Sequence, residues 1–494
     1  MHHRSKAVRP QPNREMQLRA FAQEVLSYLD GLAYGDVRVV RIRSEYLKLK
    51  NGRLEAWSDE ETLGFGVRVL VDGAWGFASS LELSSIGGRE AAAEAVRRAA
   101  ASARVTAEPV RLASVAPHVA QVFSDPAESP FLLSPESKLE FLHQAAEPLV
   151  AAGVTFATAS LGAVEEEKVF ASTEGSLIEQ RRTTTGGGID ATMVRDGDVQ
   201  IRSYPAAHDG GWGLGGFELV RAFDLAGNAP RIAEEARALL DAETCPTLRT
   251  TVILDADQVA LQLHESIGHP TELDRILGTE ASYAGTSFVH LEDLGHLRYG
   301  SPLLNVTADA TTAGALGTIA FDDEGVAGQS VPLIRKGILV GLQSSRETAP
   351  LIGRSSSGAM RASGWNRIPL VRMTNINLEP GESSLEQLIA ETEEGVLMST
   401  NKGWSIDDRR LNVNVATEIG WKIEKGELKQ MLRDCTYSGV TPAFWGSLDG
   451  LGKVSERRVV GLTNCGKGEP GQSMPVAHAV VPARFRSVAV GEGE

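Results

Sequence analysis

Cysteine is scarce in this chain, and long apolar runs are missing. Three cysteines among 494 residues, at widely separated positions, cannot build a disulfide framework. No window approaches the roughly 20 unbroken apolar residues that a membrane helix requires, and the first residues contain no apolar signal core. These absences exclude disulfide-stapled scaffolds and helical membrane proteins, and we expect a soluble protein of the reducing cytoplasm.

Positive charge is also in deficit. Asp and Glu number 64 against 49 Lys and Arg, which gives a net charge of −15. An acidic surface repels phosphate backbones and anionic lipid headgroups, so we expect neither nucleic acid nor a membrane as a partner. What remains is an ordinary globular composition, and the length suggests about three domains or two large ones.

The first part of the chain predicts a helix followed by antiparallel strands. Residues 14–32 carry apolar side chains at helical spacing, and the segment after them alternates with period two around the hairpin signal Asn51-Gly52. The same pattern repeats around Asp72-Gly73. We therefore predict at least four antiparallel strands after the first helix.

Further helices and strands are expected before residue 250. An alanine-rich helix begins near Arg89, and another begins near Ser134, with Ser134 or Ser137 as its possible cap. Short alternating runs return from Val154 to Ser203, and we interpret them as a second antiparallel sheet. The glycine-rich residues 211–218 lack the Lys-Ser/Thr ending of a phosphate loop, so we expect a flexible loop there.

These patterns predict an α+β fold. A helix expected from about Ala229 to Ala242 separates two regions of different character, because the chain beyond it is rich in glycine and short strands. We therefore predict a disordered tail at residues 1–15, an N-terminal domain of helices on an antiparallel sheet at residues 16–235, and a β-rich C-terminal domain at residues 236–494.

Candidate catalytic residues gather just after a predicted strand. Asp255 can cap a helix that carries His264, Glu265 and His269. In the HExxH motif of metalloproteases the two histidines lie one helical turn apart and face one ion. Here the spacing is one residue longer, which would set the rings about 140° apart on an ideal α-helix. We therefore predict a distorted turn at residues 266–269, either a π-bulge or a helix end.

Two imidazoles beside a carboxylate suit a catalytic zinc site, because the nitrogens bind the ion and the carboxylate accepts the proton of a water molecule. Such a site needs a third protein ligand. Cys465 lies in a glycine-rich segment bounded by proline, and its thiolate would leave one coordination position open. The other candidates are His290, His296, His478 and several carboxylates.

Two questions stay open at the level of the residues. Cys465 could instead be a nucleophile with His478 as its base, although this would leave the histidine pair without a purpose. The group that stabilises an oxyanion is also unassigned. Candidates for that role are Tyr283, Tyr437 and His296.

Four sequence motifs follow one another along the chain: HESIGH at residues 264–269, FDDEGVAGQ at 321–329, VRMTN at 371–375 and NCGKGEPGQSMPV at 464–476. Together they resemble the motifs of the TldD/PmbA family of metallopeptidases. The resemblance extends from about Asp36 to Val490, nearly the whole chain. It implies a dimeric chamber in which extended peptides are hydrolysed.

The resemblance also implies a role for each site residue. His264 and His269 correspond to zinc ligands, Glu265 to the general base, and Cys465 to the third ligand. Because all four are present, the chain resembles the catalytic TldD-type subunit, whereas the PmbA (TldE) type lacks the metal ligands. The implied activity is zinc-dependent cleavage of unfolded or extended peptides, including modified-peptide precursors, by a heterodimer with a TldE/PmbA-type homologue or by a homodimer.

Three features depart from the family pattern. Pro270 stands where the family usually has glycine, and CGKGEPGQ is two residues longer than the usual CGKxGQ. The glycine-rich end after Pro-Val is replaced by AHAVVPARFRS, which brings in His478. The first two departures favour the alternative function, a non-catalytic TldE-type partner or peptide-binding subunit of a dimeric protease.

Overall fold

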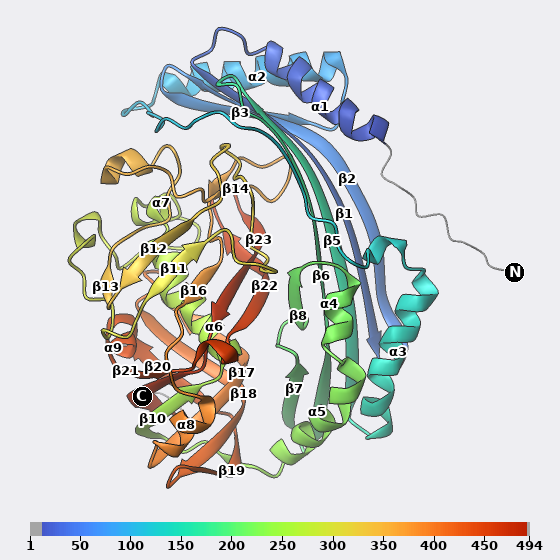
Figure 1. The fold of residues 1–494 in the computed structure, drawn as a ribbon, viewed down its shortest axis with the longest axis vertical. Helices are drawn as coiled ribbons and strands as arrows, with labels where there is room; N and C mark the ends of the chain where they lie inside the picture. Colours follow the sequence, from blue (N-terminus) through green and yellow to red (C-terminus); the bar gives the residue numbers. More distant parts are fainter. Residues whose placement is uncertain (1–11, 492–494) are drawn as a thin grey trace, which may run out of the picture.

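Two eight-stranded sheets organise the chain, one from residues before 215 and one from residues after 242. The computed structural model describes residues 12–491, and all statements about structure refer to them. In Figure 1 the long strands of the first sheet curve around the C-terminal elements, which lie on the concave side. The predicted α+β class is confirmed.

The first sheet has the strand order β3-β2-β1-β5-β6-β4, and β7 and β8 also pair with β6. Its turns at Asn51-Gly52 and Asp72-Gly73 are the predicted hairpin turns, and all four residues have positive φ. The strands are β1 (Tyr34–Lys50), β2 (Arg53–Val71), β3 (Ala74–Ser80), β4 (Val119–Phe123), β5 (Phe156–Ser172), β6 (Leu177–Arg195), β7 (Asp198–Tyr204) and β8 (Gly211–Leu214).

The prediction of at least four strands between the first helix and the alanine-rich helix is wrong, because β2 runs unbroken through a polar stretch and only three strands, β1 to β3, form in that segment. Charged pairs replace the apolar alternation there. Arg41 of β1 lies 2.6 Å from Glu61 of β2, and Arg43 lies 3.2 Å from Asp59. Such cross-strand pairs hold two strands together without a hydrophobic pattern.

The second antiparallel sheet predicted between Val154 and Ser203 is also wrong, because these strands extend the first sheet. β5 pairs with β1 along 15 residues, from Asp36–Ser172 to Lys50–Thr158. Period-two alternation identifies a strand but not its neighbour. The loop expected at residues 211–218 forms β8 and the start of a helix, because Gly186 leaves room for the Trp212 ring against β6.

Helices cover the convex side of the first sheet as two separate groups (Figure 1). Each group buries its own apolar cluster, one around Val37 and Phe65 and the other around Leu47 and Leu161. Of the two predicted caps, Ser134 and Ser137, Ser134 is the one that caps the helix, and its side chain accepts a hydrogen bond from the Ser137 amide. The helices are α1 (Pro12–Ser27), α2 (Ser85–Ala103), α3 (Pro135–Ala151), α4 (Phe217–Ala222) and α5 (Leu225–Leu239), with the short helix η1 (Pro130–Leu132).

Several predicted boundaries shift. α1 begins at Pro12, inside the segment assigned to the tail at residues 1–15, while residues 1–11 lie outside the described residues. α5 begins at Leu225, four residues before the predicted start, because the Asp224 side chain accepts a hydrogen bond from the Gly227 amide and caps the helix there. Within residues 12–491, no helix is both long and apolar enough to cross a membrane.

The second sheet closes on itself. Its order is β17-β10-β24-β20-β18-β19-β9, and β17 also pairs with β18, so five strands form a ring. Trp445, Phe444 and Phe485 pack in the apolar cluster beside it. The strands are β9 (Glu243–Thr244), β10 (Leu248–Leu254), β17 (Glu394–Ile406), β18 (Asn412–Glu424), β19 (Glu427–Arg433), β20 (Thr436–Val440), β21 (Leu448–Leu451) and β24 (Ala483–Val490).

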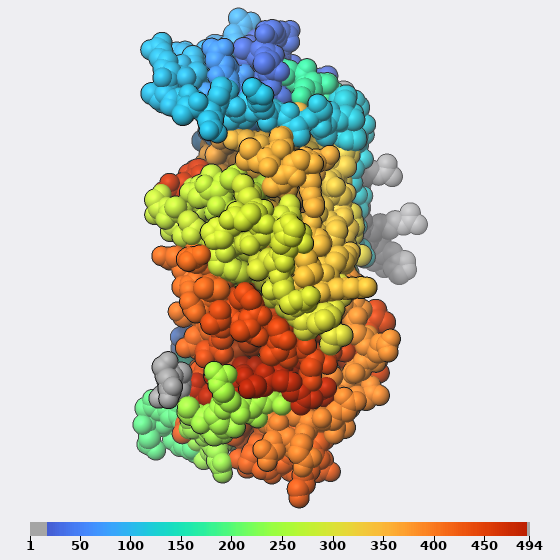
Figure 2. Space-filling view, turned by 90° about the vertical axis from the view of Figure 1, so that its left-hand side faces the viewer, coloured from blue at the N-terminus to red at the C-terminus, as the bar shows by residue number. Residues whose placement is uncertain are grey.

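Smaller elements complete the C-terminal unit, which forms most of the face seen in Figure 2. The hairpin of β22 (Arg458–Lys467) and β23 (Gln472–Val480) is one of them. The other strands are β11 (Val306–Asp309), β12 (Ser330–Arg335), β13 (Ile338–Leu339), β14 (Met360–Arg361), β15 (Leu370–Val371) and β16 (Ile376–Leu378). The helices are α6 (Ala256–Leu263), η2 (His264–Gly268), η3 (His269–Thr271), α7 (Leu273–Ile276), η4 (Leu291–Asp293), η5 (Ala349–Ile352), α8 (Leu385–Ala390), α9 (Thr441–Gly446) and η6 (Val454–Glu456).

Buried ion pairs join the first sheet to the C-terminal unit. Arg68 of β2 contacts Asp36 at 2.8 Å and reaches across to Glu324 at 3.3 Å. Lys168 of β5 contacts Asp323 at 2.6 Å. Asp323 and Glu324 belong to the FDDEGVAGQ motif, so this motif joins the two parts of the molecule.

Replacing Arg68 by alanine should lower the free energy of unfolding by about 3–5 kcal/mol, because Asp36 and Glu324 would stay buried without their cation. Arg97→Ala is the matched control, since Arg97 is 67% exposed and its pair with Glu94 lies within α2; it should cost less than about 1 kcal/mol. Urea unfolding measures the free energy of unfolding of both variants. Equal losses in the two would contradict the role of Arg68 in joining the first sheet to the C-terminal unit.

Candidate metal centre

A distorted helix brings the two histidines of the HESIGH motif together. The Asp255 side chain accepts a hydrogen bond from the Ala256 amide at the start of α6. At His264 the α-helix becomes the π-helical turn η2, in which the His269 amide donates to the His264 carbonyl oxygen. The predicted distortion is confirmed, although it begins two residues earlier than expected.

Gly268 lets this turn pack tightly. A Cβ atom at this position would lie 2.2 Å from the Met373 sulfur, so a larger residue would displace either the turn or Met373. Pro270 follows in η3, where the π-helical turn has already ended. The departure from the family pattern at Pro270 therefore leaves the turn that carries both histidines intact.

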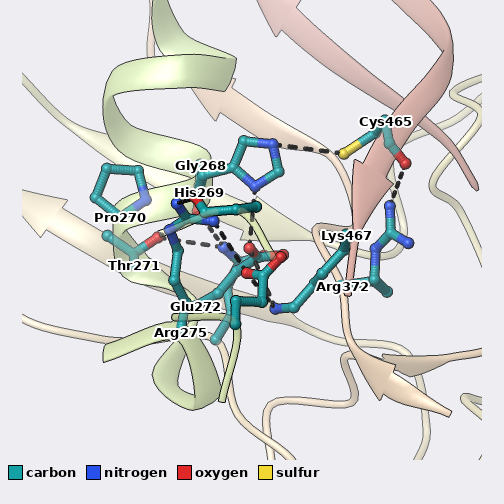
Figure 3. Close-up of polar contacts among 12 residues, drawn as sticks. Gly268, His269, Pro270, Thr271, Glu272, Arg275, Arg372, Cys465 and Lys467 are labelled. Atoms are coloured by element: carbon teal, nitrogen blue, oxygen red, sulfur yellow. Dashed lines mark hydrogen bonds and ion pairs between the residues drawn. The ribbon is translucent and has the colours of Figure 1, made fainter. Parts of the chain in front are cut away.

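His264, His269 and Cys465 form the group of metal-ligand type among the described residues. Their nitrogen and sulfur atoms all lie within 4.8 Å of one another, and all three residues are buried. The Cys465 sulfur lies 3.7 Å from Nε2 of His269 (Figure 3). Cys465 comes from β22, almost 200 residues further along the chain than His269, so only the fold brings the three donors together.

A carboxylate contacts His269 at Nδ1, the ring nitrogen that does not face Cys465. This nitrogen lies 3.0 Å from Oε2 of Glu272, and Lys467 lies 3.2 Å from the same oxygen (Figure 3). Burial raises the pKa of Glu272, but Lys467 and His269 lower it by more, so that it lies well below its usual range. The ionised carboxylate can only accept, so Nδ1 of His269 carries the proton and faces Glu272.

The pocket favours a thiolate at Cys465. Burial raises the pKa of this thiol, but His264 and His269 lower it by more, to well below its usual value. Burial lowers the pKa of His269, while Cys465 and Glu272 raise it by more, to about 9. The pocket thus stabilises positive charge beside a sulfur anion, and two imidazoles with a thiolate are a donor set that fits zinc.

Glu265 lies next to the histidines and is paired with a residue that the sequence did not single out. Its Oε2 forms an ion pair with Arg410, from the turn between β17 and β18. Burial raises the pKa of Glu265, but His264, His269 and Arg410 lower it by more. The carboxylate is therefore ionised at neutral pH and able to accept a proton.

The other candidate ligands occupy different places. His290 and His296 are exposed and lie outside the donor group. His478 is buried, with Nε2 2.9 Å from Nδ1 of His264 and Nδ1 3.0 Å from the Ile376 carbonyl oxygen. Both of its nitrogens are engaged, so it is not available as a base for Cys465.

The two tyrosines proposed for the oxyanion role also have structural partners. The buried Tyr437 hydroxyl donates to the Gln262 side chain and accepts from Gln258. Tyr283 is 55% exposed and packs on Gly468, in the turn between β22 and β23. Neither tyrosine pairs with Glu265, whose ion-pair partner is Arg410.

Three family models match the chain, all described as PmbA/TldA metallopeptidase domains. They cover residues 35–103 as domain 1, residues 128–240 as the central domain, and residues 247–486 as the C-terminal domain. The chain belongs to the TldD/PmbA family of metallopeptidases. The C-terminal match includes all four residues of the candidate centre.

Relatives from archaea and bacteria align with this family member, two of the three over more than nine-tenths of its length. A metalloprotease of Methanothermobacter thermautotrophicus is 29% identical over 94% of this chain and 96% of its own length. A metalloprotease TldD homolog of Haemophilus influenzae is 28% identical over 93% and 92%. A zinc metalloprotease TldD homolog of Saccharolobus solfataricus is 29% identical over 41% of this chain and 43% of its own.

Solved structures share the fold. TldE from Thermococcus kodakarensis superposes with a TM-score of 0.72 and covers 96% of this chain and all of its own, at 15% identity. A Thermotoga maritima protein gives a TM-score of 0.75, with 96% and 99% covered at 19% identity. At these identities the likeness concerns the fold alone.

Sequence reasoning missed Glu272, Lys467 and Arg410 as residues around the centre. Glu272 follows His269 by three residues, a spacing that could have drawn attention to it. Lys467 lies two residues beyond Cys465, within the CGKGEPGQ segment. Arg410 gave no signal, because it is 145 residues from its partner Glu265 and lies outside the four motifs.

Replacing Cys465 by serine should weaken zinc binding by more than about 100-fold, since even the loss of an outer partner costs 10–100-fold. The measurement is zinc affinity by competition with a chromophoric chelator. Cys245→Ser is the matched control, because Cys245 is also buried but lies outside the donor group. Unchanged affinity in Cys465→Ser would mean that another residue is the third ligand.

Proposed function

We propose that this chain is a zinc-dependent peptidase of the TldD type that cleaves unfolded or extended peptides. The observation that carries the proposal is the meeting of two imidazoles and a thiolate beside the ionised carboxylate of Glu265. The Saccharolobus relative, whose name includes zinc, supports the choice of metal.

The four residues divide the work. His264, His269 and Cys465 would hold the zinc ion, which when bound polarises the scissile carbonyl and lowers the pKa of a water molecule. Glu265 accepts the proton of the water and passes it to the leaving amine. A fifth residue, Arg410, pairs with this carboxylate and adds to the lowering of its pKa by His264 and His269.

A cavity beside the centre supports a peptide substrate. It measures about 250 Å³ and lies between the concave face of the first sheet and the hairpin of β22 and β23. Ile42, Trp212 and Met474 are among the residues that line it, and Met474 is the cross-strand partner of Cys465. Its walls are mostly apolar, so it suits an apolar side chain of a substrate bound next to the metal ligands.

The departures from the family pattern leave the centre intact, so they do not favour the alternative of a non-catalytic, TldE-type subunit. Pro270 leaves the π-helical turn intact. In the longer cysteine segment, Lys467, which the usual family pattern also has, pairs with Glu272, and the Gly468 amide donates to Glu280 at 3.0 Å.

The proposal extends to assembly. The catalytic unit comprises residues 236–494, and residues 16–235 form a wall of a dimeric chamber. The partner is a TldE/PmbA-type homologue or a second copy of this chain. The shared fold with a TldE protein supports a complex of two similar subunits.

Glu265→Gln should keep the zinc content of the wild type and lower peptidase activity by about 10²–10⁴-fold, because the amide cannot accept the proton. Zinc is measured by mass spectrometry, and cleavage is measured on unfolded peptides with and without a co-expressed homologue. Cleavage only by the pair would establish an obligate heterodimer.

Glu292→Gln is the matched control, since Glu292 is exposed and lies outside the centre. It should retain both zinc and activity. Full activity in Glu265→Gln would overturn the assigned base, and absence of cleavage by the wild type in both assays would overturn the proposed function.

A further inference from the structure

We propose that His478 is a positioning residue that fixes the tautomer and the ring orientation of His264, so that Nε2 of His264 is the atom presented to the metal. This inference rests on the proposed zinc site. It concerns a residue that departs from the usual family pattern, and it explains what the AHAVVPARFRS segment contributes to the centre.

His478 stands out on its own strand. Val476 and Val480, two residues before and after it on β23, are fully buried in the apolar cluster of the C-terminal unit. An apolar side chain would be expected between them, yet His478 is also fully buried. A polar ring in such a position is costly unless both of its nitrogens find partners.

Both nitrogens do find partners. Nδ1 of His478 lies 3.0 Å from the carbonyl oxygen of Ile376, and Nε2 lies 2.9 Å from Nδ1 of His264. The rings of His478 and His264 are nearly perpendicular, at 87°, with centroids 5.1 Å apart. The three groups form one chain of contacts from β16 through β23 to the π-helical turn.

The partners determine where the protons lie. A carbonyl oxygen only accepts, so Nδ1 of His478 carries a proton and donates to Ile376. The two nitrogens of His478 contact a carbonyl oxygen and the His264 ring rather than a carboxylate, and a buried neutral ring with its proton on Nδ1 has an acceptor at Nε2. Nδ1 of His264 must therefore donate to it.

The position of this proton determines which nitrogen of His264 can bind a metal. With its proton on Nδ1, neutral His264 has the lone pair on Nε2, which is the form required of a ligand. His269 obtains the same form from the Glu272 carboxylate. The two ligands are thus oriented by different groups, one charged and one neutral, and the support from His478 adds no negative charge to the centre.

Two substitutions separate this role from simple packing. The amide of His478→Gln reaches the position of Nε2 and can accept from His264, whereas the shorter amide of His478→Asn reaches only the position of Nδ1 and contacts Ile376. We expect zinc affinity to fall 10–100-fold in His478→Asn and to stay within a few-fold of wild type in His478→Gln. Chelator competition on the purified full chain, with zinc as the probe, measures this.

The outcomes are distinct. Equal affinities in the two variants, whether both wild-type or both weakened, would overturn the positioning role, because only His478→Gln keeps an acceptor at the position of Nε2. If His478→Asn fails to fold, a weakened His478→Gln alone overturns it. A wild type without zinc affinity would overturn the site and the inference together, whereas a wild type that binds zinc without cleaving peptides would overturn only the proposed function.

Discussion

One backbone hydrogen bond sets the geometry of the centre: the His269 amide donates to the carbonyl oxygen of His264. This bond spans five residues, so it forms only if α6 widens into a π-helical turn. On a regular α-helix the two rings would point in different directions, and Cys465 could meet at most one of them. Gly268 makes the turn possible because it leaves space for Met373.

Around this turn the protein places partners whose charges balance. The Cys465 thiolate faces two imidazoles, Glu272 faces His269 and Lys467, and Glu265 faces Arg410. Charges buried in this way are stable only when each has its counterpart, so the centre depends on strands that are remote in sequence. The ion pairs that join Arg68 and Lys168 to the FDDEGVAGQ motif hold the curved first sheet against the unit that carries the centre.

The sequence predicted what local chemistry determines. Hairpin turns, the cap of α3 and the distorted turn of the HESIGH motif follow from residue types over a few positions, and the structure confirms them. The pairing of β5 with β1 and the continuity of β2 depended on partners that alternation does not reveal. The contact of Arg410 with Glu265 was hidden for the same reason, because long-range contacts leave no trace in local spacing.

The proposed function depends on one zinc ion held by two histidines and one cysteine. X-ray absorption at the zinc edge of the purified protein measures these ligands. We expect a single sulfur at about 2.3 Å and imidazole nitrogens at about 2.0–2.1 Å, the distances usual for such ligands. A zinc environment without sulfur, or a protein that takes up no zinc at all, would contradict it.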